Sequence, residues 1–408
     1  MFTLPAFRSR NYRLFFTGQM ISLIGTWMQQ IAMVWLAYRL TDSAVMLGLV
    51  GFASQIPILL FSTLAGVWND RLDRRRLLLW TQFLSMLQAL ALFTLPITDT
   101  VTPPLLVTLA LLLGCINAVD LPARQAFVAQ LVEDKADLPN AIGLNSLLMN
   151  GSRFVGPTLA GLIVAIAGEA ACFLINTLSY LGVLAALAAI RLAPRTPIPR
   201  QPTLTALRAG LSYAFRHPQI RLPLFMVAGF SFFVTPYAVL MPVFAREIFQ
   251  GGADIYGFLI GSAGIGSLCA ALYLALRGRT GSPNSRAGLE GLVAHATLAG
   301  GAALTGFALV TTLSPVMYWA FPLLTLLGFA VVLTVAGSNI LIQTVVEEDY
   351  RGRVMAIFST AFLGIAPLGS LAVGIIGDTL GVRQTLMLCG LLTLGLGTLY
   401  LRRLKDRR

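Results

Sequence analysis

Two ionisable residues lie inside long apolar stretches, where a charge is costly to bury. Asp120 and Arg153 each interrupt a run of apolar residues long enough to cross a membrane. Helix geometry places Asp120 roughly 10 Å and Arg153 roughly 18 Å from the nearer ends of their helices. Charged residues at such depths are hypotheses for functional sites. One interpretation is a proton site, in which Asp120 exchanges a proton and Arg153 releases or recaptures Asp120 as substrate binds. The other is an ion pair that only ties two helices together.

Polar and aromatic side chains within other apolar stretches are candidates for substrate contacts. Gln29 and Gln30 are adjacent in the first apolar run, and aromatic residues recur between Phe225 and Tyr237. An aromatic, weakly polar cavity suits small amphiphilic molecules, although such aromatics also pack against lipid and neighbouring helices. The cavity candidates are Trp27, Gln29, Gln30, Asn117, Asn145, Asn176, Phe233 and Tyr237.

A short charged loop follows the second apolar run. A glycine allows two helices to approach closely, and an aspartate followed by clustered arginines can form a charge network at helix ends. Such a network predicts a gate that holds one conformation, while the simpler interpretation is that the arginines only anchor the loop on one side of the membrane. The gating candidates are Gly66, Asp70, Arg71, Asp73, Arg74 and Arg75.

Small residues recur at helical spacing in the fifth apolar run. Ser152, Gly156 and Ala160 are four residues apart and lie on one helix face, which permits close contact with a neighbouring helix. Pro157 removes one helical hydrogen bond and loosens the helix beside them. Ordinary helix packing is the alternative to a functional motif. The full set is Gly143, Ser152, Gly156, Pro157, Ala160 and Gly161.

The sequence contains no constellation typical of an enzyme, a metal site or a nucleotide site. Its cysteines, at positions 115, 172, 269 and 389, stand singly in apolar stretches, and its two histidines are His217 and His295. A membrane acyltransferase or hydrolase would need a His-Asp pair, a serine elbow or a zinc set, and ATP use would need a phosphate-binding loop. We therefore expect no catalytic residue, no metal and no cofactor.

The elements that must position these residues follow from the composition. The 408 residues are 57% hydrophobic and 11% charged, and the mean hydropathy is +0.79. Soluble domains carry about 25% charged residues, so the chain is predicted to be an all-α membrane protein. Twelve spans are expected near 14–38, 46–66, 77–97, 104–127, 141–167, 171–190, 221–245, 255–276, 288–312, 316–340, 354–377 and 383–401.

The basic residues orient these spans. Twenty-five of the 29 lie in loops on the side of the N-terminus, three lie in the opposite loops, and Arg153 lies within a span. Cytoplasmic loops carry the excess of basic residues, so both termini are predicted to be cytoplasmic. The net charge of +12 therefore requires no nucleic-acid partner.

The spans divide into two halves at a proline-rich linker. Residues 191–202 carry four prolines and three arginines, and an amphipathic surface helix is expected over 203–215. When each residue of the first half is compared with the residue 213 positions later, three glycines match. Gly151, Gly156 and Gly161 align with Gly364, Gly369 and Gly374. We predict an N-terminal six-helix bundle over 1–191, a cytoplasmic linker over 192–218 and a C-terminal six-helix bundle over 219–408.

The charged loop and the fifth span resemble motifs of the major facilitator superfamily. The loop follows a Gly-x-x-x-Asp-Arg-x-Gly-Arg-Arg pattern with Asp73 in place of the second glycine, and the fifth span resembles the motif of that family's antiporters. The segments 15–30, 117–127 and 150–157 resemble the branch that contains the enterobactin exporter and macrolide-efflux proteins. The resemblance covers essentially the whole chain and implies two pseudo-symmetric bundles and export.

The sequence thus predicts a monomeric exporter in the bacterial cytoplasmic membrane. It would move small amphiphilic molecules, drug-like or siderophore-like, by alternating access between two bundles, with proton antiport as the energy source and membrane lipids around it. A lipid or lysolipid flippase of the same fold is the alternative.

Overall fold

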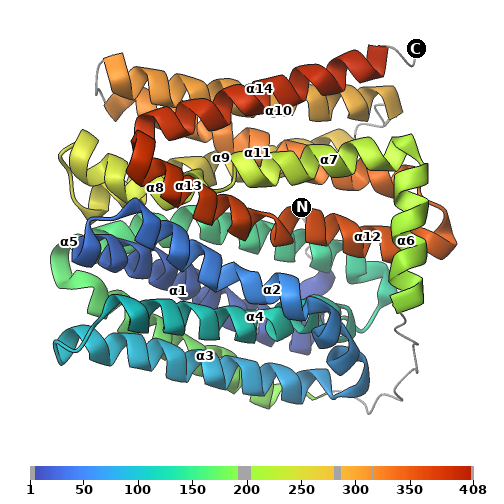
Figure 1. The fold of residues 1–408 in the computed structure, drawn as a ribbon. Coiled ribbons are helices and arrows are strands. Elements are labelled where there is room, and N and C mark those ends of the chain that lie inside the picture. The colour runs from blue at the N-terminus through green and yellow to red at the C-terminus, as the bar shows by residue number, and fades with distance from the viewer. Residues whose placement is uncertain (1–4, 192–203, 280–285, 314–316, 406–408) are drawn as a thin grey trace. The chain divides into compact units, whose positions relative to one another are not determined.

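The computed structural model describes residues 5–191, 204–279, 286–313 and 317–405. Within these residues every element is a helix (Figure 1). Eleven of the helical segments are long and apolar enough to cross a membrane. One of them, α5 (Leu138–Ala189), has 52 residues and is broken at Gly168, whose φ of 77° lies in the left-handed region. Because a span needs about 20 residues, the two parts of α5 supply two spans, which makes twelve.

The helices group into two compact units. The first unit comprises Met1–Asp42 and Ala53–Gln201, and the second comprises Ser43–Phe52 and Pro202–Arg408. The first contains α1 (Arg10–Thr41), most of α2 (Ala44–Arg71), α3 (Arg74–Ile97), α4 (Pro103–Leu131) and α5.

The C-terminal segment of the second unit begins with a short helix that precedes spans seven to twelve. This helix, α6 (Leu204–Arg216), coincides with the surface helix expected over 203–215, whereas the linker residues 192–203 lie outside the described residues. The ring of Tyr213 stacks on that of Tyr350, with 4.1 Å between the ring centres, so α6 packs on α12 (Figure 1). The other elements are α7 (Pro218–Phe233), α8 (Tyr237–Val243), α9 (Ala253–Arg279), α10 (Arg286–Leu313), α11 (Met317–Val345), α12 (Glu348–Ser359), α13 (Ala366–Leu380) and α14 (Val382–Lys405).

Two spans of the second unit are interrupted. The seventh passes from α7 to α8 and then into the π-helical turn Phe244–Ile248, and the eleventh joins α12 to α13 through the π-helical turn Thr360–Gly364. Pro236 lacks the N–H that would bond the carbonyl of Phe232. That carbonyl instead faces Gly369 of α13, where a side chain would overlap it. The interruptions therefore allow close contact between α7 and α13.

The burial pattern is that of membrane helices. Large apolar side chains such as those of Ile166, Leu313 and Trp80 are strongly exposed, whereas Gln29, Asp120 and Asn176 are buried. Lipid tails solvate apolar surface, so helices in a membrane associate through close packing and polar contacts. The interior of the first unit accordingly includes polar side chains such as those of Gln29, Asp120 and Asn176.

Candidate functional site

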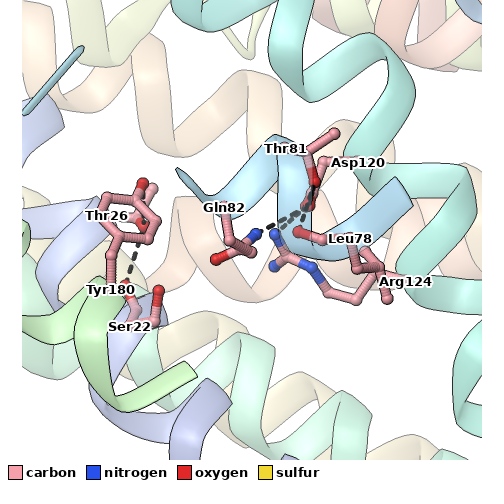
Figure 2. A network of polar contacts seen from close by, with 8 residues as sticks. All are labelled: Ser22, Thr26, Leu78, Thr81, Gln82, Asp120, Arg124 and Tyr180. Atoms are coloured by element: carbon pink, nitrogen blue, oxygen red, sulfur yellow. Dashed lines mark hydrogen bonds and ion pairs between the residues drawn. The ribbon is translucent and has the colours of Figure 1, made fainter. Parts of the chain in front are cut away.

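The Asp120 carboxylate is the centre of a buried polar cluster between α3 and α4. Its side chain is 1% exposed. One carboxylate oxygen accepts hydrogen bonds from Thr81 Oγ1 at 2.7 Å and Gln82 Nε2 at 2.8 Å, and the other pairs with the guanidinium of Arg124. Figure 2 shows these donors converging on the carboxylate. The carboxylate is therefore held by donors on two helices.

Local sequence accounts for this geometry. Asp120 and Arg124 are four residues apart, the spacing that brings side chains together on one helix face. Thr81 and Gln82 come from α3, which is joined to α4 by the short connection 98–102 and packs along it. Because α4 continues to Leu131, Asp120 lies 11 residues, or roughly 16 Å, from the helix end.

Arg124 is the site residue that the sequence analysis missed. The count of basic residues assigns Arg124 to a cytoplasmic loop, although this residue falls inside the span expected over 104–127. The structure corrects the assignment, because α4 continues to Leu131 and the Arg124 side chain is 15% exposed. The i,i+4 spacing to Asp120 was the signal that could have identified it.

Arg153 lies on α5, beside Trp27 of α1. The guanidinium carbon lies 5.5 Å from the centre of the indole ring, and both side chains are half-buried. The expected pairing of Asp120 with Arg153 is thus replaced by an Asp120–Arg124 pair and an Arg153–Trp27 contact.

One of the small residues of the fifth span, Gly156, lies at the contact with α1. Ser152, Gly156 and Ala160 are buried, as are Pro157 and Gly161. A side chain at Gly156 would overlap Cβ of Trp27, so this glycine sets the close approach of the two helices. Gly143 is different, because it is exposed and has no neighbour within 4 Å of where a Cβ would lie.

Two cavity candidates, Gln29 and Asn176, belong to a second buried network. Asn176 Nδ2 donates to Gln29 Oε1 at 2.7 Å, and Gln29 Nε2 donates to Gln88 Oε1 at 2.8 Å. Gln88 in turn donates to the carbonyl of Leu109 at 3.1 Å. These bonds join α1, α3, α4 and the second part of α5. Since the amides bond one another, their geometry favours a role in holding the bundle together.

Tyr180 lies between the two polar clusters. Its hydroxyl is 3.5 Å from Thr26 Oγ1, and the side chains of Ser85 and Asn176 lie within its reach. Figure 2 places the Tyr180–Thr26 contact beside the Asp120 cluster. On α3, the buried polar residues Thr81, Gln82, Ser85 and Gln88 follow one helix face. This polar face was also missed, although its three-to-four-residue spacing is visible in the sequence.

The remaining cavity candidates are less buried. Gln30 is exposed, and Asn117 and Asn145 are half-buried. Phe233 and Tyr237, also half-buried, flank the interruption between α7 and α8 in the second unit. There Ser231 Oγ donates to the carbonyl of Phe362.

The described part of the charged loop holds helix ends together. Asp73 accepts a hydrogen bond from the backbone N–H of Arg76 at 2.8 Å and thereby caps α3 in an extended conformation. Arg75 donates from Nε to the carbonyl of Leu187 and from Nη2 to that of Ala188, both at 2.6 Å. Arg74 donates to the carbonyl of Ala126 at 3.4 Å. The side chains of Gly66, Asp70 and Arg71 lie outside the described residues.

Residues that typically bind metals are not clustered in the described part of the chain. Among the described residues, no group of three or more His, Cys, Asp or Glu side chains could hold an ion. The four cysteines are all unpaired.

Comparison with known proteins gives a match along nearly the whole chain. The model of the family described as transmembrane secretion effector matches residues 2–407. The Staphyloferrin A transporter of Staphylococcus aureus is 29% identical, over 93% of each chain. The multidrug efflux pump Tap of Mycolicibacterium fortuitum is 25% identical, over 92% of each. The Macrolide efflux protein A of Streptococcus pyogenes is 22% identical, over 92% of this chain and 91% of its own.

The fold matches that of solved transporters. A variant of the nucleoside transporter NupG superposes with a TM-score of 0.73 and 11% sequence identity, over 96% of this chain and 98% of its own. The likeness confirms the predicted major facilitator fold and, at this identity, extends to the fold alone.

Proposed function

Because the chain belongs to the transmembrane secretion effector family of major facilitator transporters, we propose that it exports small amphiphilic molecules by proton antiport. Membership of this family makes it a multi-pass membrane transporter of small molecules and not an enzyme. The names of two relatives describe efflux of drugs and macrolides, which supports export. We place it in the bacterial cytoplasmic membrane as a monomer with both termini in the cytoplasm.

The observation that carries proton coupling is the buried Asp120 cluster. The carboxylate is ionisable, lies deep in a span and is held by donors on two helices. Because the donors come from two helices, a movement of α3 relative to α4 changes the contacts of the carboxylate. We propose that this change couples proton exchange at Asp120 to the conformational change of alternating access.

Transport into proteoliposomes tests this proposal. Vesicles containing the protein would be assayed for accumulation of a fluorescent drug with and without an imposed pH gradient. We expect the gradient to drive accumulation, and Asp120→Asn to abolish it while preserving substrate exchange between equal internal and external pools. The control Asp99→Asn alters an exposed carboxylate with a φ of 52°, a conformation that asparagine tolerates.

The outcomes separate the roles that Asp120 could have. Loss of both gradient-driven transport and exchange would assign Asp120 to structure or substrate binding instead of coupling. Unchanged gradient-driven transport would remove it from the proton pathway. Gradient-independent movement of a fluorescent lysolipid, with no movement of drugs, would contradict the exporter hypothesis and support the flippase hypothesis. A susceptibility screen in an efflux-deficient strain would identify the drug to use.

A further inference from the structure

An exposed patch of aromatic and basic residues surrounds the turn between α6 and α7 in the second unit. We propose that this patch binds an anionic phospholipid, whose phosphate pairs with two arginines while an acyl chain contacts two aromatic rings. The inference concerns lipid binding alone, so it depends neither on the substrate nor on the energy source of transport. The patch consists of Leu211, Phe215, Arg216, Arg221 and Phe225.

The helix α6 presents different faces to the protein and to its surroundings. Gly210, Tyr213 and Ala214 form the side that packs on α12. Leu211 and Phe215 are four residues apart on another face and are both exposed, because successive residues are turned by about 100° around a helix. In Figure 1, α6 lies across the ends of α7 and α12. The apolar surface of α6 therefore extends beyond its contact with α12.

Phe225 extends this apolar surface into the seventh span. It lies in α7, seven residues or roughly 10 Å from the start of the helix at Pro218, and it is 53% exposed. Its ring meets that of Phe215 edge to face, with 5.8 Å between the ring centres. Lipid tails are as apolar as such side chains, so the two rings together offer a surface that suits an acyl chain at the edge of the membrane.

Two arginines stand beside the aromatic pair. Arg216 directly follows Phe215 and is exposed, and Arg221 is half-buried and precedes Phe225 by four residues, which places both on one face of α7. Within the described residues, neither guanidinium has an acidic partner. The sequence has no Asp or Glu over 170–246. The local charge is therefore positive and complements an anion.

The acidic residues at the start of α12 approach a different side of α6. The backbone N–H of Glu347 donates to the hydroxyl of Tyr213 at 3.3 Å, and Glu348 pairs with Arg351 at 3.3 Å. Tyr213 and Phe215 are two residues apart, so they point to nearly opposite sides of the helix. The helix therefore separates the aromatic part of the patch from these carboxylates.

The combination of charge and aromatic surface favours a lipid over a soluble anion. A guanidinium donates paired hydrogen bonds that match a phosphate, and basic residues next to the membrane attract anionic head groups. A free phosphate could use only the arginines, whereas a phospholipid also covers the exposed rings of Phe215 and Phe225. Phosphatidylglycerol has both features, and phosphatidylcholine is a suitable comparison because its head group has no net charge.

Native mass spectrometry of the full chain in a neutral detergent tests the proposal. It would give dissociation constants for phosphatidylglycerol and phosphatidylcholine with identical acyl chains. We expect phosphatidylglycerol to bind more tightly, and Arg216→Gln and Arg221→Gln each to weaken its binding about fivefold without affecting phosphatidylcholine. Replacing both arginines by lysine should retain most of the preference, and Phe225→Ala should weaken the binding of both lipids.

A second double variant controls for total charge. Arg402 and Arg403 are exposed near the end of α14, so replacing both by glutamine removes the same charge as Arg216→Gln, Arg221→Gln and should leave the preference intact. Because all these side chains are exposed or half-buried, each variant should unfold at the temperature of the unmodified protein. Glycerol phosphate, which lacks acyl chains, should not displace the lipid.

Three results would overturn the lipid site. They are a preference for phosphatidylglycerol that survives Arg216→Gln, Arg221→Gln, an equal loss of preference in the variant altered at Arg402 and Arg403, and displacement of the lipid by glycerol phosphate. Because binding is measured without transport, a failure of proton-coupled export would not alter the outcome.

Discussion

The Asp120 carboxylate is buried inside the first unit, and three donors surround it. Two come from α3, and the third is Arg124 on its own helix. Burying two charges is costly, and only good geometry with additional hydrogen bonds repays that cost. We therefore expect the stability of the protein to be sensitive to the loss of any single member of the cluster.

Replacing one member of the ion pair should cost more than replacing both. Arg124→Gln leaves a buried carboxylate without its cation, which we expect to destabilise the protein by about 3–5 kcal/mol. The double variant Asp120→Asn, Arg124→Gln should lose less than the sum of the single variants. Thermal unfolding in detergent would measure this coupling. Arg351→Gln, which breaks the exposed pair with Glu348, should have little effect, and additive losses at positions 120 and 124 would contradict the account.

The amide network predicts that replacing Gln88, which belongs to it, and replacing Gln30, which is exposed, have different effects on stability and transport. Gln88→Leu leaves the Nε2 donor of Gln29 and the Leu109 carbonyl without their partner. We expect the free energy of unfolding to fall by about 1–3 kcal/mol without a change in substrate preference. Gln30→Leu, at an exposed position, should alter transport and leave the unfolding temperature nearly unchanged. Transport assays paired with thermal unfolding would distinguish the effects of the two variants. If Gln88→Leu altered transport and left stability unchanged, the network of Gln29 and Asn176 would be assigned to the substrate cavity.

At the scale of elements, α2 is divided between the two units. Its first turns belong to the second unit and the rest to the first, with the change between Phe52 and Ala53. The first turns are held by Asp378 of α13, which accepts hydrogen bonds from the N–H of Ala44 at 2.6 Å and from Ser43 Oγ at 3.0 Å. Pro57 lacks the N–H that would bond the Ala53 carbonyl, so the helix is weakened next to this division.

Removing the cap on α2 should measurably destabilise the protein. Asp378→Ala deletes both hydrogen bonds, and loss of an N-terminal cap costs typically about 1 kcal/mol. Asp137→Ala is a matched control, because Asp137 stands at the N-cap of α5 without a side-chain cap bond. We expect a lower unfolding temperature for Asp378→Ala than for Asp137→Ala, and equal temperatures would show that this cap contributes nothing.

The elements were largely predictable, while the contacts within them were not. Apolar run length located the spans, and the small residues around Gly156 indicated a close helix contact. The helix α4 ends four residues beyond the expected Phe127, and the charge of Arg124 indicates a loop residue as long as its ion-pair partner is unknown. The partners of Asp120 and Arg153 depend on which helix faces meet, and the interruption at Pro236 depends on a carbonyl facing Gly369. Periodicity within a single helix does not contain that information.

For the whole molecule, the distribution of arginine predicts the topology. With the four native cysteines replaced, Thr100→Cys in the connection between α3 and α4 should react with a membrane-impermeant maleimide added to intact cells. Gly352→Cys in α12, an exposed position, should react only after the membrane is permeabilised. Labelling with the opposite pattern would reverse the orientation assigned to the termini.

Proton-coupled export is the central claim, and the proton flux caused by substrate tests it most directly. Proteoliposomes with no initial pH gradient would receive an outwardly or inwardly directed substrate gradient, and a trapped dye would report internal pH. Antiport predicts that substrate leaving the vesicles acidifies the interior, that reversing the substrate gradient makes it alkaline, and that Asp120→Asn abolishes both changes. Substrate movement without any change in internal pH would contradict the account.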